Sequence, residues 1–124
     1  MAYRPTVWRR GFDLANSQDV TAALLVMDVQ NSIVTRFAAD ALLARLNRAI
    51  SAARAAGVPV IYVRVAFRDG YPEVSSSNRA FSAIAGQGGY GSDDEATQVH
   101  AAVAPRPGDV VVVKKRVSAF AGSD

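Results

Sequence analysis

The hydrophobic pattern of the chain starts with an uninterrupted apolar run at residues 22–27, which ends at Asp28. Strands that are covered on both faces read as continuous apolar runs, as in parallel sheets sandwiched by helices. Between residues 38 and 56 the period changes, and apolar side chains recur every three or four positions. This second segment predicts an amphipathic helix that follows the first strand.

A turn and a second strand are expected after this helix. Gly57 stands where a left-handed residue commonly ends a helix, and Pro59 cannot continue one. Residues 58–65 are rich in β-branched side chains, which favour a strand. A strand, a helix and a second strand over this length predict a βαβ unit with parallel strands.

The rest of the chain is less regular. Residues 66–94 hold many Gly and Ser residues, and we expect a long loop there with one short helix near residues 78–85. A loop of this length in a compact domain usually serves as a lid or a pocket wall. We expect a helical turn within residues 95–103 and a third strand at residues 110–113.

Residues 1–20 show no steady period and predict an N-terminal arm. Trp8 and Phe12 suggest that this arm is anchored, either on its own domain or on a partner subunit. It lacks the apolar centre of a signal peptide. Since the longest apolar stretch is far too short to span a membrane, we expect a cytoplasmic protein that does not bind membranes.

Composition argues against several classes of function. The formal net charge is +3, and Lys and Arg do not form the stripe with interleaved aromatics that is typical of nucleic-acid binding. The chain has no cysteine, which excludes a disulfide framework and a thiolate metal site within it. Its single histidine, His100, argues against a zinc site, and we interpret it as a loop or helix-surface residue.

Two ionisable residues stand at the carboxyl ends of predicted strands, where ligands bind in open parallel sheets. Asp28 closes the first strand and Lys114 closes the third. Together they could hold each other charged and tune a third group between them. Both lysines of the chain, Lys114 and Lys115, lie at this point, which favours a chemical role. The alternative is that Asp28 caps a loop and Lys114 is an ordinary surface residue.

Three blocks of sequence resemble one family. Residues 24–31 read Leu-Leu-Val-Met-Asp-Val-Gln-Asn, and residues 56–60 read Ala-Gly-Val-Pro-Val. The third block has Pro-Gly-Asp at residues 107–109 before the last strand and Ser-Ala-Phe at residues 118–120. In this order they are similar to the isochorismatase-like hydrolase family of the cysteine hydrolase superfamily. No Gly-x-Gly-x-x-Gly follows the first strand, which disfavours a nucleotide-binding domain.

The resemblance implies an α/β fold of three layers, αβα and Rossmann-like, with a mainly parallel sheet that is incomplete at the C-terminus. It assigns residues 21–124 to the N-terminal part of the hydrolase domain. It implies a catalytic triad in which Asp28 and Lys114 match the aspartate and the lysine, with Lys115 as the alternative. The family cysteine would lie beyond this chain. Gln30 and Phe120 would line the substrate pocket.

The implied activity is hydrolysis of a small molecule, with cleavage of a C–N amide bond as the first hypothesis. One alternative is a vinyl-ether hydrolase that works without cysteine, and another is a non-catalytic binding or assembly module. Residues 65–72 lack the histidine of the nicotinamidase metal motif, so we expect no metal and no cofactor. The expected partners are a small-molecule substrate and further copies of the chain in a homo-oligomer.

Overall fold

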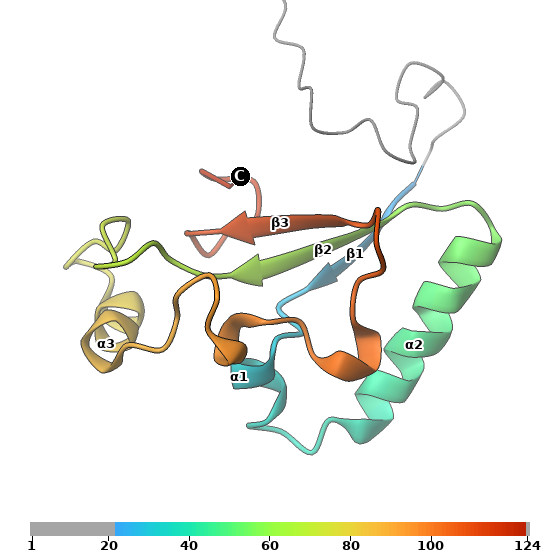
Figure 1. The fold of residues 1–124 in the computed structure, drawn as a ribbon, viewed down its shortest axis with the longest axis horizontal. Helices are drawn as coiled ribbons and strands as arrows, with labels where there is room; N and C mark the ends of the chain where they lie inside the picture. The colour runs from blue at the N-terminus through green and yellow to red at the C-terminus, as the bar shows by residue number, and fades with distance from the viewer. Residues whose placement is uncertain (1–21, 124) are drawn as a thin grey trace, which may run out of the picture.

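The computed structural model describes residues 22–123, so the predicted arm at residues 1–20 lies outside the described part. The chain forms a mixed α/β unit with a parallel three-stranded sheet in the order β1-β2-β3 (Figure 1). Its elements are, in order, β1 (Leu24–Met27), α1 (Asn31–Val34), α2 (Asp40–Ala55), β2 (Val60–Val65), α3 (Arg79–Gln87), η3 (Glu95–Thr97), η4 (Ala101–Val103) and β3 (Val110–Lys114). The α/β class and the parallel sheet predicted from the sequence are confirmed.

Strand β2 is the centre of the sheet and pairs in parallel with both neighbours. Met27 is the register partner of Val63 on one side, and Lys114 is the partner of Val65 on the other. The three strands therefore end at the same edge of the sheet. Residues 58 and 59 precede β2 rather than forming part of it, although the Pro59 carbonyl accepts a hydrogen bond from the Leu24 N–H at 2.9 Å.

Helix α2 ends as the sequence predicts. Gly57 has φ of +71°, the left-handed conformation that glycine adopts at little cost. The Gly57 N–H donates to the Arg54 carbonyl, and the Val58 N–H donates to the Ala53 carbonyl. These are the two hydrogen bonds of a Schellman motif, which satisfy the last carbonyls of the helix. The turn redirects the chain into β2.

An ion pair fastens the end of α2 to the start of β3. The Arg54 guanidinium contacts the Asp109 carboxylate, and Asp109 also accepts a hydrogen bond from the Arg106 N–H at 2.7 Å. Tyr62, which is 0% exposed, lies beside this pair. Burial raises the pKa of Tyr62, and the charge of Arg54 opposes this effect. The aspartate of the Pro-Gly-Asp segment therefore has a structural role, because it connects the end of α2 to the start of β3.

The core lies between one face of the sheet and the layer formed by α1, α2 and η4 (Figure 1). Its buried side chains are Val26, Val34, Leu43, Ile50, Val60, Tyr62 and Val103. On the opposite face, Leu25 and Met27 are 38% and 39% exposed. Thus residues 22–123 supply the sheet and one helical layer, and apolar positions on the other face of β1 remain accessible.

Three local features differ from the sequence prediction. The short helix α1 was not expected, because four residues are too few to show a helical period. The helical turn expected within residues 95–103 is two separate 3₁₀ helices, η3 and η4. The short helix of the long loop is α3, which starts after Asn78, whose Oδ1 accepts a hydrogen bond from the Phe81 N–H. No helix within residues 22–123 is long and apolar enough to cross a membrane.

Candidate active site

The structure brings Asp28 and Lys114 together at the carboxyl edge of the sheet. The Lys114 Nζ lies 2.9 Å from Asp28 Oδ1 and donates a hydrogen bond to Asp28 Oδ2 at 3.1 Å. Asp28 directly follows β1 and Lys114 is the last residue of β3, and these strands flank β2, so the contact spans the width of the sheet. Both distances are within about 4 Å, the limit for an ion pair, as expected if the two residues hold each other charged.

Lys114 is nearly buried, with 3% of its surface exposed. Its ammonium also donates a hydrogen bond to the Val117 carbonyl at 3.0 Å. A buried charge is tolerated only when it is paired and hydrogen-bonded, and Lys114 has both kinds of partner. Lys114 is therefore a fixed positive charge rather than a mobile surface lysine.

Asp28 is held in an unusual conformation. Its φ of +58° lies in the left-handed region, which few residues other than glycine, asparagine and aspartate adopt. The Asp28 N–H still pairs with the Val63 carbonyl at 2.9 Å, so the turn comes directly after the last sheet hydrogen bond. Backbone strain of this kind clusters at functional sites, and here it aims the carboxylate at Lys114.

The two oxygens of the Asp28 carboxylate differ in their contacts. Oδ1 is inaccessible to solvent and accepts no hydrogen bond from any described residue. The Lys114 ammonium lies 2.9 Å from Oδ1. This contact is an ion pair, but it does not have the angles of a hydrogen bond. A carboxylate oxygen with unused lone pairs can take a proton from a group placed against it.

Gln30 is fully buried and joins β1 to the end of β2. Its Oε1 accepts a hydrogen bond from the Val65 N–H at 2.8 Å, and its Nε2 donates to the Val65 carbonyl at 3.1 Å. The side-chain amide of Gln30 thus makes the hydrogen bonds with Val65 that the main chain of a neighbouring strand would otherwise make. The predicted contact of Gln30 with substrate stays a prediction, because in this structure the amide is engaged with the protein main chain.

Phe120 lies in the turn that follows β3 and is 87% exposed. Its N–H donates a hydrogen bond to the Ser118 Oγ at 3.1 Å, which shapes the turn. The structure does not bring Phe120 into contact with the Asp28–Lys114 pair, and its place in a substrate pocket stays a prediction. His100 caps η4, with its Nδ1 accepting a hydrogen bond from the Ala102 N–H at 3.1 Å, so it occupies a loop position.

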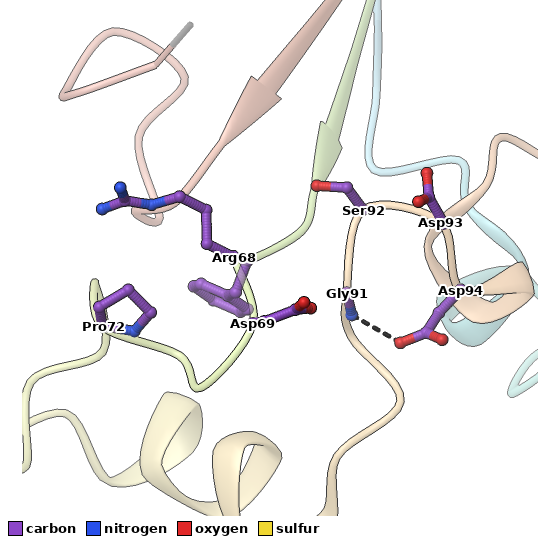
Figure 2. A pocket seen from close by; sticks show the side chains of 8 residues that line it. Arg68, Asp69, Pro72, Gly91, Ser92, Asp93 and Asp94 are labelled. Atoms are coloured by element: carbon purple, nitrogen blue, oxygen red, sulfur yellow. Dashed lines mark hydrogen bonds between the residues drawn. The ribbon is translucent and has the colours of Figure 1, made fainter.

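A polar hollow of about 520 Å³ lies beyond the end of β2, between the loop after this strand and the loop at residues 91–94. Figure 2 shows the Asp69 carboxylate directed toward the second loop, where Asp94 accepts a hydrogen bond from the Gly91 N–H at 2.7 Å. The sequence indicated a pocket wall here through the length of the loop but did not identify these carboxylates. Within residues 22–123 no group of three or more His, Asp or Glu side chains is arranged to hold a metal ion.

Two arginines shape the loops around this hollow. Arg64 of β2 donates hydrogen bonds to the Ser92 and Thr97 carbonyls, and its burial lowers its pKa from the usual value. Arg68 pairs with Glu73. Burial by itself raises the pKa of Glu73, but hydrogen bonds from Arg68 and from the Glu73 backbone, together with the charge of Arg68, leave the pKa below its usual value. The irregular loop is thus held in place by charged contacts.

Comparison with known proteins places the chain in a family. The sequence model of the isochorismatase domain matches residues 22–124. The chain belongs to the isochorismatase family. Among related sequences, ureidoacrylate amidohydrolase RutB of Stutzerimonas stutzeri is 32% identical, and the match covers 82% of this chain and 50% of that protein.

Two solved structures resemble the fold of this chain. A cysteine hydrolase from Pseudomonas syringae pv. phaseolicola is 27% identical with a TM-score of 0.65, and the match covers 82% of this chain and 50% of that one. N-carbamoylsarcosine amidase from Thermoplasma acidophilum is 27% identical with a TM-score of 0.61, over 82% of this chain and 56% of that one. The chain therefore spans about half the length of these relatives.

Proposed function

We propose that this chain carries the acid and the lysine of an isochorismatase-family hydrolase that breaks a C–N bond of a small amide. The observation that carries the proposal is the ion pair at the carboxyl edge, where a nearly buried ammonium meets a carboxylate oxygen that accepts no hydrogen bond. Two relatives, an amidohydrolase and an amidase, are named for amide hydrolysis. Because the chain has no cysteine, residues outside these 124 would supply the nucleophile.

In this proposal Asp28 moves protons and Lys114 stabilises charge. Asp28 takes the proton of the thiol, and the Lys114 ammonium favours the thiolate that results. The thiolate attacks the amide carbon, a C–S bond forms, and the C–N bond breaks as Asp28 returns the proton to the leaving nitrogen. Asp28 then takes a proton from water, the hydroxide displaces the thiolate, and the thiol is protonated again.

The remaining site residues have supporting tasks. Gln30 acts through Val65, because its amide fixes the end of β2 against the segment that carries Asp28. Phe120 is exposed and could cover a substrate from the side of β3. The partner of the site is a small molecule.

The test compares the 124-residue chain with the same chain extended by the coding sequence that follows residue 124, using ammonia release from N-carbamoylsarcosine. The short chain should show no turnover, since a thioester cannot form without a thiol. The extended protein should be active, and Asp28→Asn or Lys114→Ala should each lower kcat at least about a thousandfold. Lys115→Ala is the matched control and should retain activity. Amide turnover by the 124-residue chain would overturn the proposal.

A second candidate is hydrolysis of a vinyl ether, in which Asp28 acts as an acid without a thiol, because this reaction needs only groups that these 124 residues contain. Turnover of isochorismate by the 124-residue chain, lost in Asp28→Asn, would establish this alternative. A stop codon after residue 124, with no turnover of either substrate, would instead identify a non-catalytic binding module.

A further inference from the structure

The Lys114 ammonium has a second acceptor besides the Asp28 carboxylate, the main-chain carbonyl of Val117 at 3.0 Å. An ammonium has three N–H donors on a flexible stem, so several acceptors are needed to hold it in one position. The two acceptors come from different parts of the chain, because Asp28 follows β1 and Val117 lies in the turn after β3. The position of the ammonium therefore depends on how firmly this turn is held.

The turn after β3, residues 115–123, carries large apolar side chains that stay outside the core. Those of Val117 and Phe120 are 75% and 87% exposed. The Phe120 N–H donates a hydrogen bond to the Ser118 Oγ within the turn. The Ser123 hydroxyl likewise donates to the Ala119 carbonyl. Such local contacts shape the turn but do not fasten it to the sheet.

Arg116 connects this turn to the loop that follows β2. Its Nη1 donates a hydrogen bond to the Glu73 carbonyl, 43 positions away in the sequence. The same nitrogen donates to the Lys115 carbonyl at 3.4 Å, so the guanidinium also contacts its own turn. Since Val117 is the next residue, Arg116 ties the segment that carries the acceptor of Lys114 to a different part of the molecule.

Glu73 is a firm point of attachment. Its carboxylate pairs with the Arg68 guanidinium and also accepts a hydrogen bond from the Arg68 N–H at 3.4 Å. The Glu73 side chain is only 10% exposed. Arg68 directly follows Phe67, which is 1% exposed, so this loop is attached to a buried part of the chain. The bond from Arg116 thus joins an exposed turn to a fixed support.

We propose that Arg116 is a positioning residue for Lys114, because it ties the turn after β3 to Glu73 and so holds the Val117 carbonyl against the ammonium. This inference rests on the proposed hydrolase function, in which Lys114 stabilises the thiolate. It adds a residue that acts through Lys114 without touching the reacting atoms. When the tie is lost, the turn opens more often and the ammonium loses its second acceptor. A charge that moves stabilises a reaction less than one that is held in place beforehand.

The low lysine content of the chain makes a direct spectroscopic test possible. Lys114 and Lys115 are the only lysines of the sequence, so isotope-labelled lysine gives two side-chain ammonium signals in a nitrogen NMR spectrum. Lys114→Met identifies the signal of Lys114. The quantity measured in the 124-residue chain is the rate at which the Lys114 ammonium protons exchange with water. Buried, hydrogen-bonded protons exchange only when their contacts open, so this rate reports how often the ammonium is released.

Arg116→Ala should speed this exchange about tenfold, the effect expected when one hydrogen bond to a charged group is weakened. Arg116→Lys, which keeps a long cationic donor, should retain part of the protection. Arg54→Ala is the matched control, since it breaks the ion pair with Asp109 at the opposite end of β3 and should destabilise the fold without changing the exchange. An unchanged rate in Arg116→Ala, or an equal increase in Arg54→Ala, would overturn the inference.

Circular dichroism checks that each variant folds. Should Arg116→Ala fail to fold, Arg116→Gln takes its place with the same expectation, because its amide is too short to reach the Glu73 carbonyl in the same way. Faster exchange in the variant that folds supports the inference, and an unchanged rate overturns it.

Activity of the extended protein separates this inference from the proposed function. Arg116→Ala should lower kcat about tenfold and change KM less than about twofold, because the ammonium acts on charge that forms during the reaction. A raised KM with unchanged kcat would mean that Arg116 contacts the substrate directly and would overturn the positioning role. Faster exchange in Arg116→Ala, without amide turnover by the extended protein, would contradict the hydrolase and leave the tie between Arg116 and Lys114 in place.

Discussion

Asp28 has a left-handed backbone conformation, and its carboxylate contacts the nearly buried ammonium of Lys114. Neither feature is favourable on its own, because the backbone conformation costs about 1–2 kcal/mol and an unpaired buried charge costs more. They persist because the sheet hydrogen bond from Asp28 to Val63 and the contacts of Lys114 hold both residues in place. The site is thus rigid before any ligand arrives.

Removing the charge of Asp28 should destabilise the fold, and it should also reduce any activity. Asparagine tolerates the left-handed backbone, so Asp28→Asn isolates the loss of the counter-ion of Lys114. We expect a loss of about 1–3 kcal/mol, below the range of fully buried pairs because the Asp28 side chain is 39% exposed. Urea unfolding measures it. Adding Lys114→Met to Asp28→Asn should restore part of the stability, and equal midpoints for Asp28→Asn and the unsubstituted chain would contradict the prediction.

At the scale of elements, glycine positions decide where helices stop. Gly57 ends α2 with a positive φ, whereas Gly86 lies within α3 and has an ordinary helical position. A Cβ at either position would meet no atom within 4 Å. The two sites therefore differ in backbone conformation and not in available space, which makes them a matched pair.

Alanine at these two glycines should have opposite effects on stability. Gly57→Ala should destabilise the chain by about 1 kcal/mol, because the methyl group disfavours the left-handed conformation of the Schellman turn. Gly86→Ala should stabilise it by about 0.5–1 kcal/mol, because alanine loses less backbone entropy in a helix. Thermal unfolding followed by circular dichroism gives both values. Changes of the same sign would show that one of the two backbone conformations is wrong.

At the scale of the molecule, the face of β1 that points away from α2 stays open, because Leu25 and Met27 on it are 38% and 39% exposed. Leu42 and Phe37 are exposed near the helical layer. Contiguous apolar surface on a protein commonly marks an interface. The homo-oligomer expected from the sequence stays a prediction, and this face is where it can be tested.

We expect the 124-residue chain to associate through the open face of β1. Leu25→Thr combined with Met27→Thr should lower the association constant in sedimentation experiments while the unfolding midpoint changes little, because both side chains are partly exposed. The matched control, Val26→Thr, changes the buried face of the same strand and should destabilise the fold by about 1–3 kcal/mol. Association that persists in the double variant would exclude this face as the interface.

The sequence alone was sufficient for the strands, helix α2 and the Asp28–Lys114 pair. Apolar runs and helical periods are local signals, and parallel strands that share a sheet must end at a common edge. Because Asp28 and Lys114 each close a strand, their meeting follows from topology without knowledge of any side-chain contact. The end of α2 at Gly57 is equally local, since it depends on one residue type at one position.

Only the tertiary structure decided what surrounds that pair. The amide of Gln30 binds the main chain of Val65, 35 positions away, and such a contact leaves no trace in a local pattern. The bond from Arg116 to the Glu73 carbonyl joins positions 43 apart, because the loop after β2 and the turn after β3 come together in the fold. Local sequence determines the elements, because backbone preference and burial act over a few residues, whereas the shape of a pocket depends on which distant side chains fill the space between them.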